Sequence, residues 1–310
     1  MTHLENSFTG KNNFWRYLVM IAAIFAATNT IGAIPFLIVT AVKSASNPDV
    51  LSQMSSEGGS ALSLGISQNF MFILMLFPFI VGLAAYVLLI KPLHERSFLQ
   101  SITGHSAFRW KRFCISGAIW MILMGLFLFI YIGFDPANFS INNKGSSLII
   151  LILLSFLLIP FQAAFEEIVF RGYLMQGFNR LLPAKIFPLL ATAILFALMH
   201  SMNPEVKEFG FFAVMPQYLL FGLIFGLTTI LDDGIESALG AHSANNIFLC
   251  IMVTQKSAAL QTPALFEQHL YRPGVEIAGL AVAGLIFVCA LWKIFGWKRI
   301  SLLSESHQVS

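Results

Sequence analysis

Charged residues are scarce in this sequence. Only 11% of its 310 residues are Asp, Glu, Lys or Arg, whereas soluble proteins carry about 25%. Hydrophobic residues make up 57%, and the mean hydropathy is +0.78. A soluble globule cannot bury that much apolar surface, so the composition excludes a disordered chain and an ordinary soluble enzyme. It predicts an integral, multi-pass membrane protein that lies in the lipid bilayer.

Cysteine and net charge are also low. Cys114, Cys250 and Cys289 lie in apolar segments without CxxC or CxxH spacing, which excludes a disulfide-stapled domain and provides no metal-binding motif. The formal net charge is only +3, and no basic stripe is interleaved with aromatic residues. Nucleic acid is therefore not an expected partner.

Apolar stretches are what the sequence has in abundance. An α-helix needs about 20 apolar residues to cross the hydrocarbon core. The stretches that approach this length are Phe14–Val42, Phe70–Ile90, Phe113–Phe134, Ser147–Phe165, Ile186–His200, Gly210–Leu231, Ser237–Val253 and Gly274–Trp292. They predict an all-α, polytopic membrane protein with about eight transmembrane helices. Pro35 is expected to kink the long first stretch. Without an internal repeat, residues 1–310 are interpreted as a single membrane domain.

Lysine and arginine are unevenly distributed between the expected loops. Of the 18 in the chain, five fall in one set of alternate loops: Lys43, Lys144, Lys207, Lys256 and Arg272. Because cytoplasmic loops carry the excess of Lys and Arg, the N- and C-termini are predicted to be cytoplasmic. In a bacterium the protein would lie in the cytoplasmic (inner) membrane.

Polar side chains inside the apolar stretches are few and clustered. An ionisable side chain in hydrocarbon costs about 3 kcal/mol or more, so each is a candidate functional residue. The candidates are Glu166, Glu167 and Arg171 at and just beyond the fourth stretch, His200 at the end of the fifth, and His242 with Asn246 in the seventh.

Helical spacing separates the two glutamates. Glu167 and Arg171 are four residues apart on one helix face and can neutralise each other. They are predicted to form a structural pair that supports the helix. Glu166 is rotated about 100° from its neighbour and is free to point elsewhere.

Residue counts also relate the depths of the candidates. At a rise of 1.5 Å per residue, Glu166 and His200 lie about equally far from the expected hairpin tip in LLPAK. His242 reaches the same level if that hairpin projects about 13 Å into the cytoplasm. Glu166, His200, His242 and Asn246 are therefore expected to meet in one pocket on the cytoplasmic side of the bilayer.

These four side chains have the chemistry needed for hydrolysis of an acyl group by water. Glu166 can act as the general base, and His200 can orient the water or share its proton. His242 and Asn246 can donate hydrogen bonds to the developing oxyanion.

A metal mechanism uses three of the same residues. Glu166, His200 and His242 would be zinc ligands, with water as the fourth. The metal-free mechanism is favoured, and no cofactor is expected, because Asn246 and a free base need no Lewis acid.

Three motifs within residues 147–253 resemble those of a known family. EEIVFR matches EExxxR, FALMH matches FxxxH and HSANN matches HxxxN, in that order. Together they resemble the CPBP family of intramembrane endopeptidases, which includes CAAX-processing Rce1-type proteases and bacteriocin-immunity (Abi) relatives.

The resemblance implies an eight-helix fold and cleavage of a membrane-anchored peptide or protein, including lipidated CAAX-like substrates. It implies that Glu166 is the base, that His200 assists it, and that His242 and Asn246 form the oxyanion hole. A second class of function stays open. In a non-catalytic immunity or scaffold protein of the membrane, the same polar cluster would only hold helices together.

Overall fold

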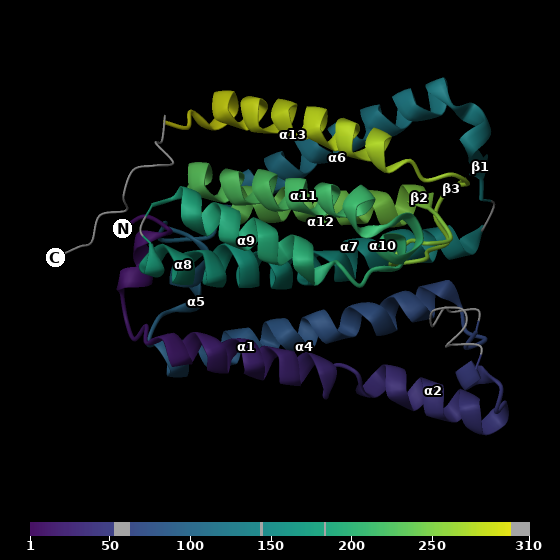
Figure 1. Ribbon diagram of the computed structural model, residues 1–310, viewed down its shortest axis with the longest axis horizontal. Helices are drawn as coiled ribbons and strands as arrows, with labels where there is room; N and C mark the ends of the chain where they lie inside the picture. The colour runs from purple at the N-terminus through teal and green to yellow at the C-terminus, as the bar shows by residue number, and fades with distance from the viewer. Residues whose placement is uncertain (53–62, 143–144, 183, 299–310) are drawn as a thin grey trace.

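The computed structural model describes residues 1–52, 63–142, 145–182 and 184–298. Within these ranges most of the chain is α-helical (Figure 1). The longer helices are α1 (Phe14–Asn29), α2 (Ile34–Ser46), α4 (Gln68–His94), α6 (Trp110–Phe134), α7 (Ser146–Glu167), α9 (Ile186–Met199), α11 (Phe211–Asp232), α12 (Glu236–Met252) and α13 (Pro273–Phe295).

Shorter elements connect these helices. The helical ones are η1 (Glu5–Phe8), α5 (Phe98–Ile102), η2 (Pro136–Asn138), the π-helical segment η3 (Ile168–Leu174), α8 (Met175–Leu181) and α10 (Pro204–Phe209). The strands are β1 (Phe139–Ile141), β2 (Val253–Thr254) and β3 (Phe266–Gln268). In this small sheet β3 is central, antiparallel to β1 and parallel to β2, with Phe139 opposite Gln268.

The predicted fold class is confirmed. Six segments of the described chain are long and apolar enough to cross a membrane: Phe14–Ser46, Gln68–His94, Trp110–Phe134, Ser146–Leu181, Phe211–Asp232 and Pro273–Phe295. The fifth and seventh predicted stretches correspond to shorter helices, α9 with 14 residues and α12 with 17. The protein is therefore an all-α, multi-pass membrane protein, while the count of eight spans and the single domain stay predictions.

The first apolar stretch consists of two helices instead of one kinked helix. α1 ends at Asn29 and α2 begins at Ile34, so the break precedes Pro35. Gly32 lies in this break against α4, where an added Cβ would be 2.8 Å from the Cα of Pro78. Pro35 lies in the first turn of α2, where its missing N–H would have no intrahelical partner.

Helix α12 lies inside the bundle and packs against α6, α7 and α11 (Figure 1). Small residues make this close packing possible. At Gly240 an added Cβ would collide with the carbonyl oxygen of Phe113 in α6. It would also lie 3.0 Å from the Cα of Phe113. Ala238, Ala241 and Ala244 are buried on the same helix. Small residues at helix contacts allow backbones to approach closely in membrane proteins.

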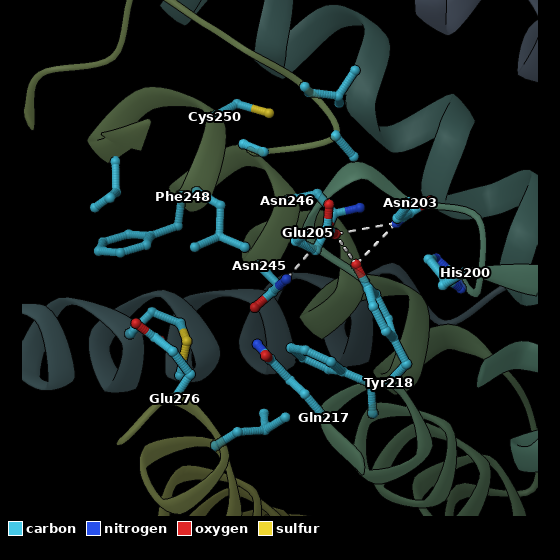
Figure 2. A pocket seen from close by; sticks show the side chains of 18 of the residues that line it. His200, Asn203, Glu205, Gln217, Tyr218, Asn245, Asn246, Phe248, Cys250 and Glu276 are labelled. Atoms are coloured by element: carbon cyan, nitrogen blue, oxygen red, sulfur yellow. Dashed lines mark hydrogen bonds between the residues drawn. The ribbon is translucent and has the colours of Figure 1, made fainter. Parts of the chain in front are cut away.

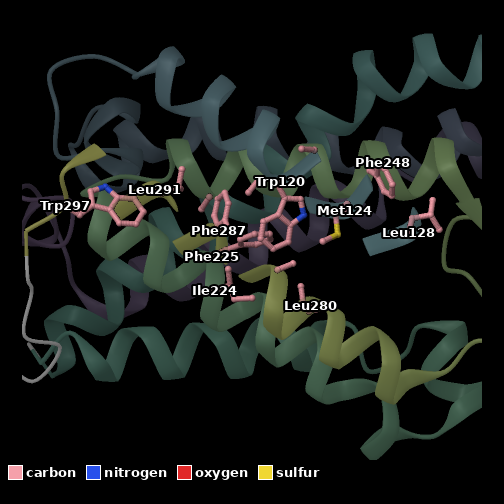
Figure 3. Close-up of a cluster of buried hydrophobic side chains, with 14 residues drawn as sticks. Trp120, Met124, Leu128, Ile224, Phe225, Phe248, Leu280, Phe287, Leu291 and Trp297 are labelled. Carbon is pink, nitrogen blue, oxygen red and sulfur yellow. The ribbon is translucent and has the colours of Figure 1, made fainter. Parts of the chain in front are cut away.

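The largest hydrophobic cluster joins α6, α11, α12 and α13 (Figure 3). Trp120 is fully buried at its centre, with ring-centroid distances of 4.9 Å to Phe287 and 5.4 Å to Phe225. Both pairs are edge-to-face, which is the favoured arrangement for aromatic rings. This cluster supports one wall of the site described below.

The two ends of the bundle differ in their charged residues. The N-terminal residues lie beside α5 and α8, at the end opposite the sheet (Figure 1). Four basic residues belong to elements at the sheet end: Lys43 lies in α2, Lys207 lies in α10, Lys256 follows β2, and Arg272 directly precedes α13. Lys144 lies outside the described residues. This arrangement agrees with the alternation of loops expected from the sequence, and the cytoplasmic position of the termini stays a prediction.

Substitution of Gly240 by Ala tests the close contact between α6 and α12. The added methyl group has to displace the backbone at Phe113, so Gly240→Ala is expected to lose about 1–3 kcal/mol of stability. Gly125→Ala in α6 is the matched control, because its nearest neighbour, Phe248 Cε2, would be 3.9 Å away. Thermal unfolding in detergent measures both variants, and equal losses would contradict the packing described here.

Candidate active site

The EExxxR motif lies where α7 changes into a π-helical turn. α7 ends at Glu167, and η3 carries Arg171. Such π-helical turns occur often at functional sites. Despite the wider turn, Arg171 Nη1 lies 2.8 Å from Glu167 Oε1, and both side chains are fully buried. The predicted Glu167–Arg171 ion pair is therefore present.

Aromatic rings surround the buried guanidinium of Arg171. Its Cζ lies 4.3 Å from the ring centroid of Phe196 in α9 and 5.8 Å from that of Phe225 in α11. Nε and Nη2 of Arg171 have no hydrogen-bond partner in the structure. The ring faces supply part of the stabilisation that these donors lack, since a cation is attracted to an aromatic face.

Glu167 has a second partner that the sequence analysis did not foresee. Its Oε1 lies 2.7 Å from His242 Nδ1. With Glu167 ionised, Nδ1 carries the hydrogen, and the other ring nitrogen points away. That nitrogen, Nε2, lies 3.6 Å from Oε2 of Glu166. The His242 ring also stacks on Phe225, with centroids 5.3 Å apart. Glu167 thus fixes the orientation of this imidazole toward Glu166.

A chain of side-chain amides holds Glu166 and Asn246. Gln162 Nε2 donates to Glu166 Oε1 at 2.6 Å, and Asn246 Nδ2 donates to Gln162 Oε1 at 2.9 Å. Asn245 Nδ2 donates to Asn246 Oδ1 at 3.0 Å, and Trp120 Nε1 donates to Asn245 Oδ1 at 3.1 Å. The sequence analysis missed Gln162, although a polar residue one turn before Glu166 in an apolar stretch was a usable signal.

This amide chain leaves two groups available to a ligand. Glu166 is 9% exposed, and its Oε2 has no hydrogen-bond partner within the described ranges. Asn246 uses one of its two amide hydrogens on Gln162 and keeps the other. An unpartnered acceptor and an unused donor therefore lie on neighbouring helices.

His200 directly follows α9 and is held by two contacts. Its Nδ1 lies 2.8 Å from the carbonyl oxygen of Phe196, so Nδ1 is the donor and Nε2 is left as an acceptor. Its ring stacks on that of Tyr218, with centroids 4.3 Å apart (Figure 2). Within the described residues, no hydrogen bond joins His200 to Glu166, His242 or Asn246.

The four side chains proposed from the sequence line one cavity of about 450 Å³. Glu166, His200, His242 and Asn246 all line it. Glu167 and Arg171 are not among the lining residues and lie behind the wall that Glu166 and His242 form. The four side chains therefore converge, from α7, the end of α9, and α12.

The cavity extends from the four side chains to the small sheet. Besides the four side chains, its lining includes Phe139, Val253 and Gln268 of the three strands. The expected position of the pocket on the cytoplasmic side of the bilayer stays a prediction. At the N-terminal end of the bundle, Arg109 Nη2 lies 2.7 Å from Glu236 Oε2 and 3.2 Å from Asp232 Oδ2. Counting residues along a helix gives depth but not the side on which space is left.

The zinc alternative has no assembled ligand set. In the described ranges, no group of three His, Cys, Asp or Glu side chains is placed to hold a metal ion. Glu166, His200 and His242 share the cavity, but His200 stacks on Tyr218, and in the described part of the chain no hydrogen bond joins it to the other two.

The comparisons with known proteins agree with the motifs. Residues 145–248 match the family model described as type II CAAX prenyl endopeptidase, Rce1-like. This segment is therefore similar to the Rce1-like family. The resemblance expected from EExxxR, FxxxH and HxxxN is thereby confirmed, because all three motifs lie in the matched range. The match supports an intramembrane endopeptidase in general terms.

One curated relative matches along nearly the whole length. The uncharacterized protein YyaK of Bacillus subtilis (strain 168) is 28% identical over 286 residues, which cover 91% of this chain and 93% of YyaK. No solved structure matches the chain. The likeness to YyaK thus includes the N-terminal helices that lie outside the Rce1-like segment.

The N-terminal residues are attached to the π-helical turn. His3 is buried, and its Nε2 lies 2.8 Å from the carbonyl oxygen of Arg171. Gln176 Nε2 lies 3.3 Å from His3 Nδ1, and Asp233 Oδ1 accepts from the His3 backbone N–H at 2.6 Å. These contacts fit a neutral imidazole, with Nε2 as donor and Nδ1 as acceptor. The sequence analysis gave His3 no role, because it lies in a polar tail.

Removal of Arg171 tests the buried ion pair. Arg171→Leu leaves the carboxylate of Glu167 buried with only His242 as partner, so a loss of about 3–5 kcal/mol in stability is expected. The double variant Glu167→Gln/Arg171→Leu should recover part of that loss. Arg272→Gln is the control, because the Arg272–Asp135 pair is partly exposed and should contribute less than about 1 kcal/mol. Thermal unfolding in detergent measures the loss of stability in each variant. Equal losses in Arg171→Leu and Arg272→Gln would contradict the role of the buried pair.

The buried imidazole of His3 predicts a pH dependence of stability. Burial lowers the pKa of His3 from its ordinary value of 6.5, although the bond to Arg171 and the charges of Asp233 and Glu236 oppose this and Arg96 adds to it. Because the folded pKa is the lower one, this stability is complete above about pH 6.5 and is lost as the pH falls. The melting temperature should therefore fall more between pH 7.5 and 5 in the wild type than in His3→Gln. Parallel curves would exclude His3 as the titrating group.

Proposed function

We propose that this protein is an intramembrane endopeptidase that hydrolyses a peptide bond of a membrane-associated protein or peptide. The observation that carries the proposal is the free oxygen of Glu166. It is buried, has no hydrogen-bond partner among the described residues, and lies 3.6 Å from His242 Nε2 in a cavity that His200 and Asn246 also line. The Rce1-like segment supports the same class of reaction.

In this proposal Glu166 is the general base. Its Oε2 takes a proton from a water molecule while the water oxygen attacks the carbonyl carbon of the scissile bond. His200 Nε2, which is left as an acceptor, takes a hydrogen bond from the same water and orients it. The proton on Glu166 then passes to the leaving amine as the carbon–nitrogen bond breaks, which restores the carboxylate.

Asn246 and His242 would stabilise the negative charge on the former carbonyl oxygen. Asn246 provides its unused amide hydrogen. His242 provides Nε2–H in the form that has both ring nitrogens protonated, while Nδ1 stays bonded to the carboxylate of Glu167. Such donors contribute about 3–4 kcal/mol each when they are aimed at a developing oxyanion in a site with little water.

The family description suggests lipidated, CAAX-like proteins as a substrate class. The lining of the cavity also includes apolar side chains, among them Met75, Phe79, Met124, Phe127 and Leu128. An apolar segment of a membrane-anchored substrate fits such a lining, because burial of apolar surface is favourable there.

A non-catalytic scaffold or immunity protein is the second candidate. The amide chain favours it, since Gln162, Asn246, Asn245 and Trp120 join α7, α12 and α6 by hydrogen bonds. Polar side chains that bond across helices stabilise membrane bundles without any chemistry. The unpartnered oxygen of Glu166 is what this alternative leaves unexplained.

Glu166→Gln separates the two candidates. The variant is nearly isosteric but cannot accept a proton, so cleavage should fall by about 10²–10⁴-fold while the melting temperature changes little. Asn246→Leu should reduce kcat by about 10²–10³-fold through loss of one oxyanion donor. The assay uses the full chain in lipid vesicles, a library of membrane-associated peptides and mass spectrometry of the products.

Other results of this assay would point elsewhere. Undiminished cleavage by Glu166→Gln would reject Glu166 as the base. Cellular function that survives the substitution would favour the scaffold. Loss of activity with chelator, together with stoichiometric zinc in the active protein, would favour a metalloprotease.

A further inference from the structure

A second polar cluster lies in the cavity beside His200. Asn203 Nδ2 lies 3.2 Å from Glu205 Oε1 and 2.9 Å from the Tyr218 hydroxyl oxygen. The Tyr218 hydroxyl itself donates to Glu205 Oε1 (Figure 2). Since Tyr218 also stacks on His200, this cluster lies next to the proposed reaction site.

Glu205 keeps one carboxylate oxygen without a partner. Its side chain is 8% exposed and lines the cavity. Oε1 accepts from both Asn203 and Tyr218, whereas Oε2 has no hydrogen-bond partner in the structure. A buried charged oxygen that lacks a partner is costly, so a donor brought by a ligand would be bound favourably.

Acidic side chains outnumber Lys and Arg in the described lining of the cavity. Its lining includes the carboxylates of Glu166, Glu205 and Glu276, and none of the described lining residues is Lys or Arg. Arg272, which precedes α13, is engaged by Asp135 at 3.0 Å. A concave site with carboxylates and no cation attracts a positive group and repels a free carboxylate.

We propose that Glu205 is a specificity-determining residue that binds a Lys or Arg side chain of the peptide substrate. The proposal rests on the endopeptidase function proposed above. Glu205 Oε2 accepts a hydrogen bond from the cationic group, while Asn203 and Tyr218 hold the other oxygen in place. The Tyr218–His200 stack puts the cationic residue within a few positions of the scissile bond.

Matched peptides test this preference. The full chain in lipid vesicles is assayed with membrane-associated peptides that carry Lys, norleucine or Glu at one position and are otherwise identical. The variable position is moved in turn along both sides of the cleaved bond. At one position Lys should exceed norleucine by about tenfold or more in kcat/KM, mainly through KM, and Glu should be cleaved least.

Variants of the same short helix assign the preference to Glu205. Glu205→Gln should bring the Lys-to-norleucine ratio close to one. Glu208→Gln is the matched control, because Glu208 is exposed on α10, and it should keep the wild-type ratio. If Glu205→Gln does not fold, as judged by thermal unfolding, Glu205→Asp retains the charge on a shorter arm and should give an intermediate ratio.

The outcomes distinguish the two proposals. Glu166-dependent cleavage with no preference for Lys at any position, or with the same preference in Glu205→Gln, overturns the role of Glu205 and leaves the endopeptidase proposal intact. Absence of any Glu166-dependent cleavage overturns both.

Discussion

The buried pair of Glu167 and Arg171 is the constraint on which the site depends. Neither charged side chain is exposed to water, so interactions with the surrounding groups have to replace the lost hydration. The guanidinium of Arg171 lies over the rings of Phe196 and Phe225, and the carboxylate of Glu167 contacts His242. These partners come from α9, α11 and α12. Neutralising one ion pair therefore draws together the helices that carry the three motifs, and the resulting geometry holds His242 toward Glu166.

This arrangement also explains why two adjacent glutamates behave differently. Glu167 faces the interior of the bundle, where Arg171 and His242 both contact its Oε1, whereas Glu166 lines the cavity and is held at one oxygen by Gln162. The other oxygen has no hydrogen-bond partner among the described residues and lies 3.6 Å from His242 Nε2. A carboxylate that is fixed in place and only half satisfied is suited to accept a proton, since the protein supplies its position without using its lone pairs.

Much of this site could be predicted from the sequence, but not all of it. Spacing along a helix decides which side chains share a face, so the Glu167–Arg171 pair and the convergence of Glu166 with the two histidines were predictable. Spacing carries no information about which end of the bundle is filled. The direction in which the cavity extends was therefore not predictable. Gln162 and Glu205 were missed because their roles depend on contacts with other helices, Asn246 in α12 and Tyr218 in α11.

The direction of the cavity bears on how a substrate would reach it. The cavity extends to the sheet end, where the described Lys and Arg residues are few, while the N-terminal end is closed by ion pairs of Arg109 and Arg112 with Asp232. If the termini are cytoplasmic, as the loop charges predict, the cavity faces the opposite side of the membrane. A cationic peptide would then approach the carboxylates from a side with few Lys and Arg residues. A membrane potential that is negative inside would favour inward movement of the peptide by about 2.3 kcal/mol per charge for each 100 mV crossed. Topology and charge preference are thus linked, because both follow from the same uneven distribution of basic residues.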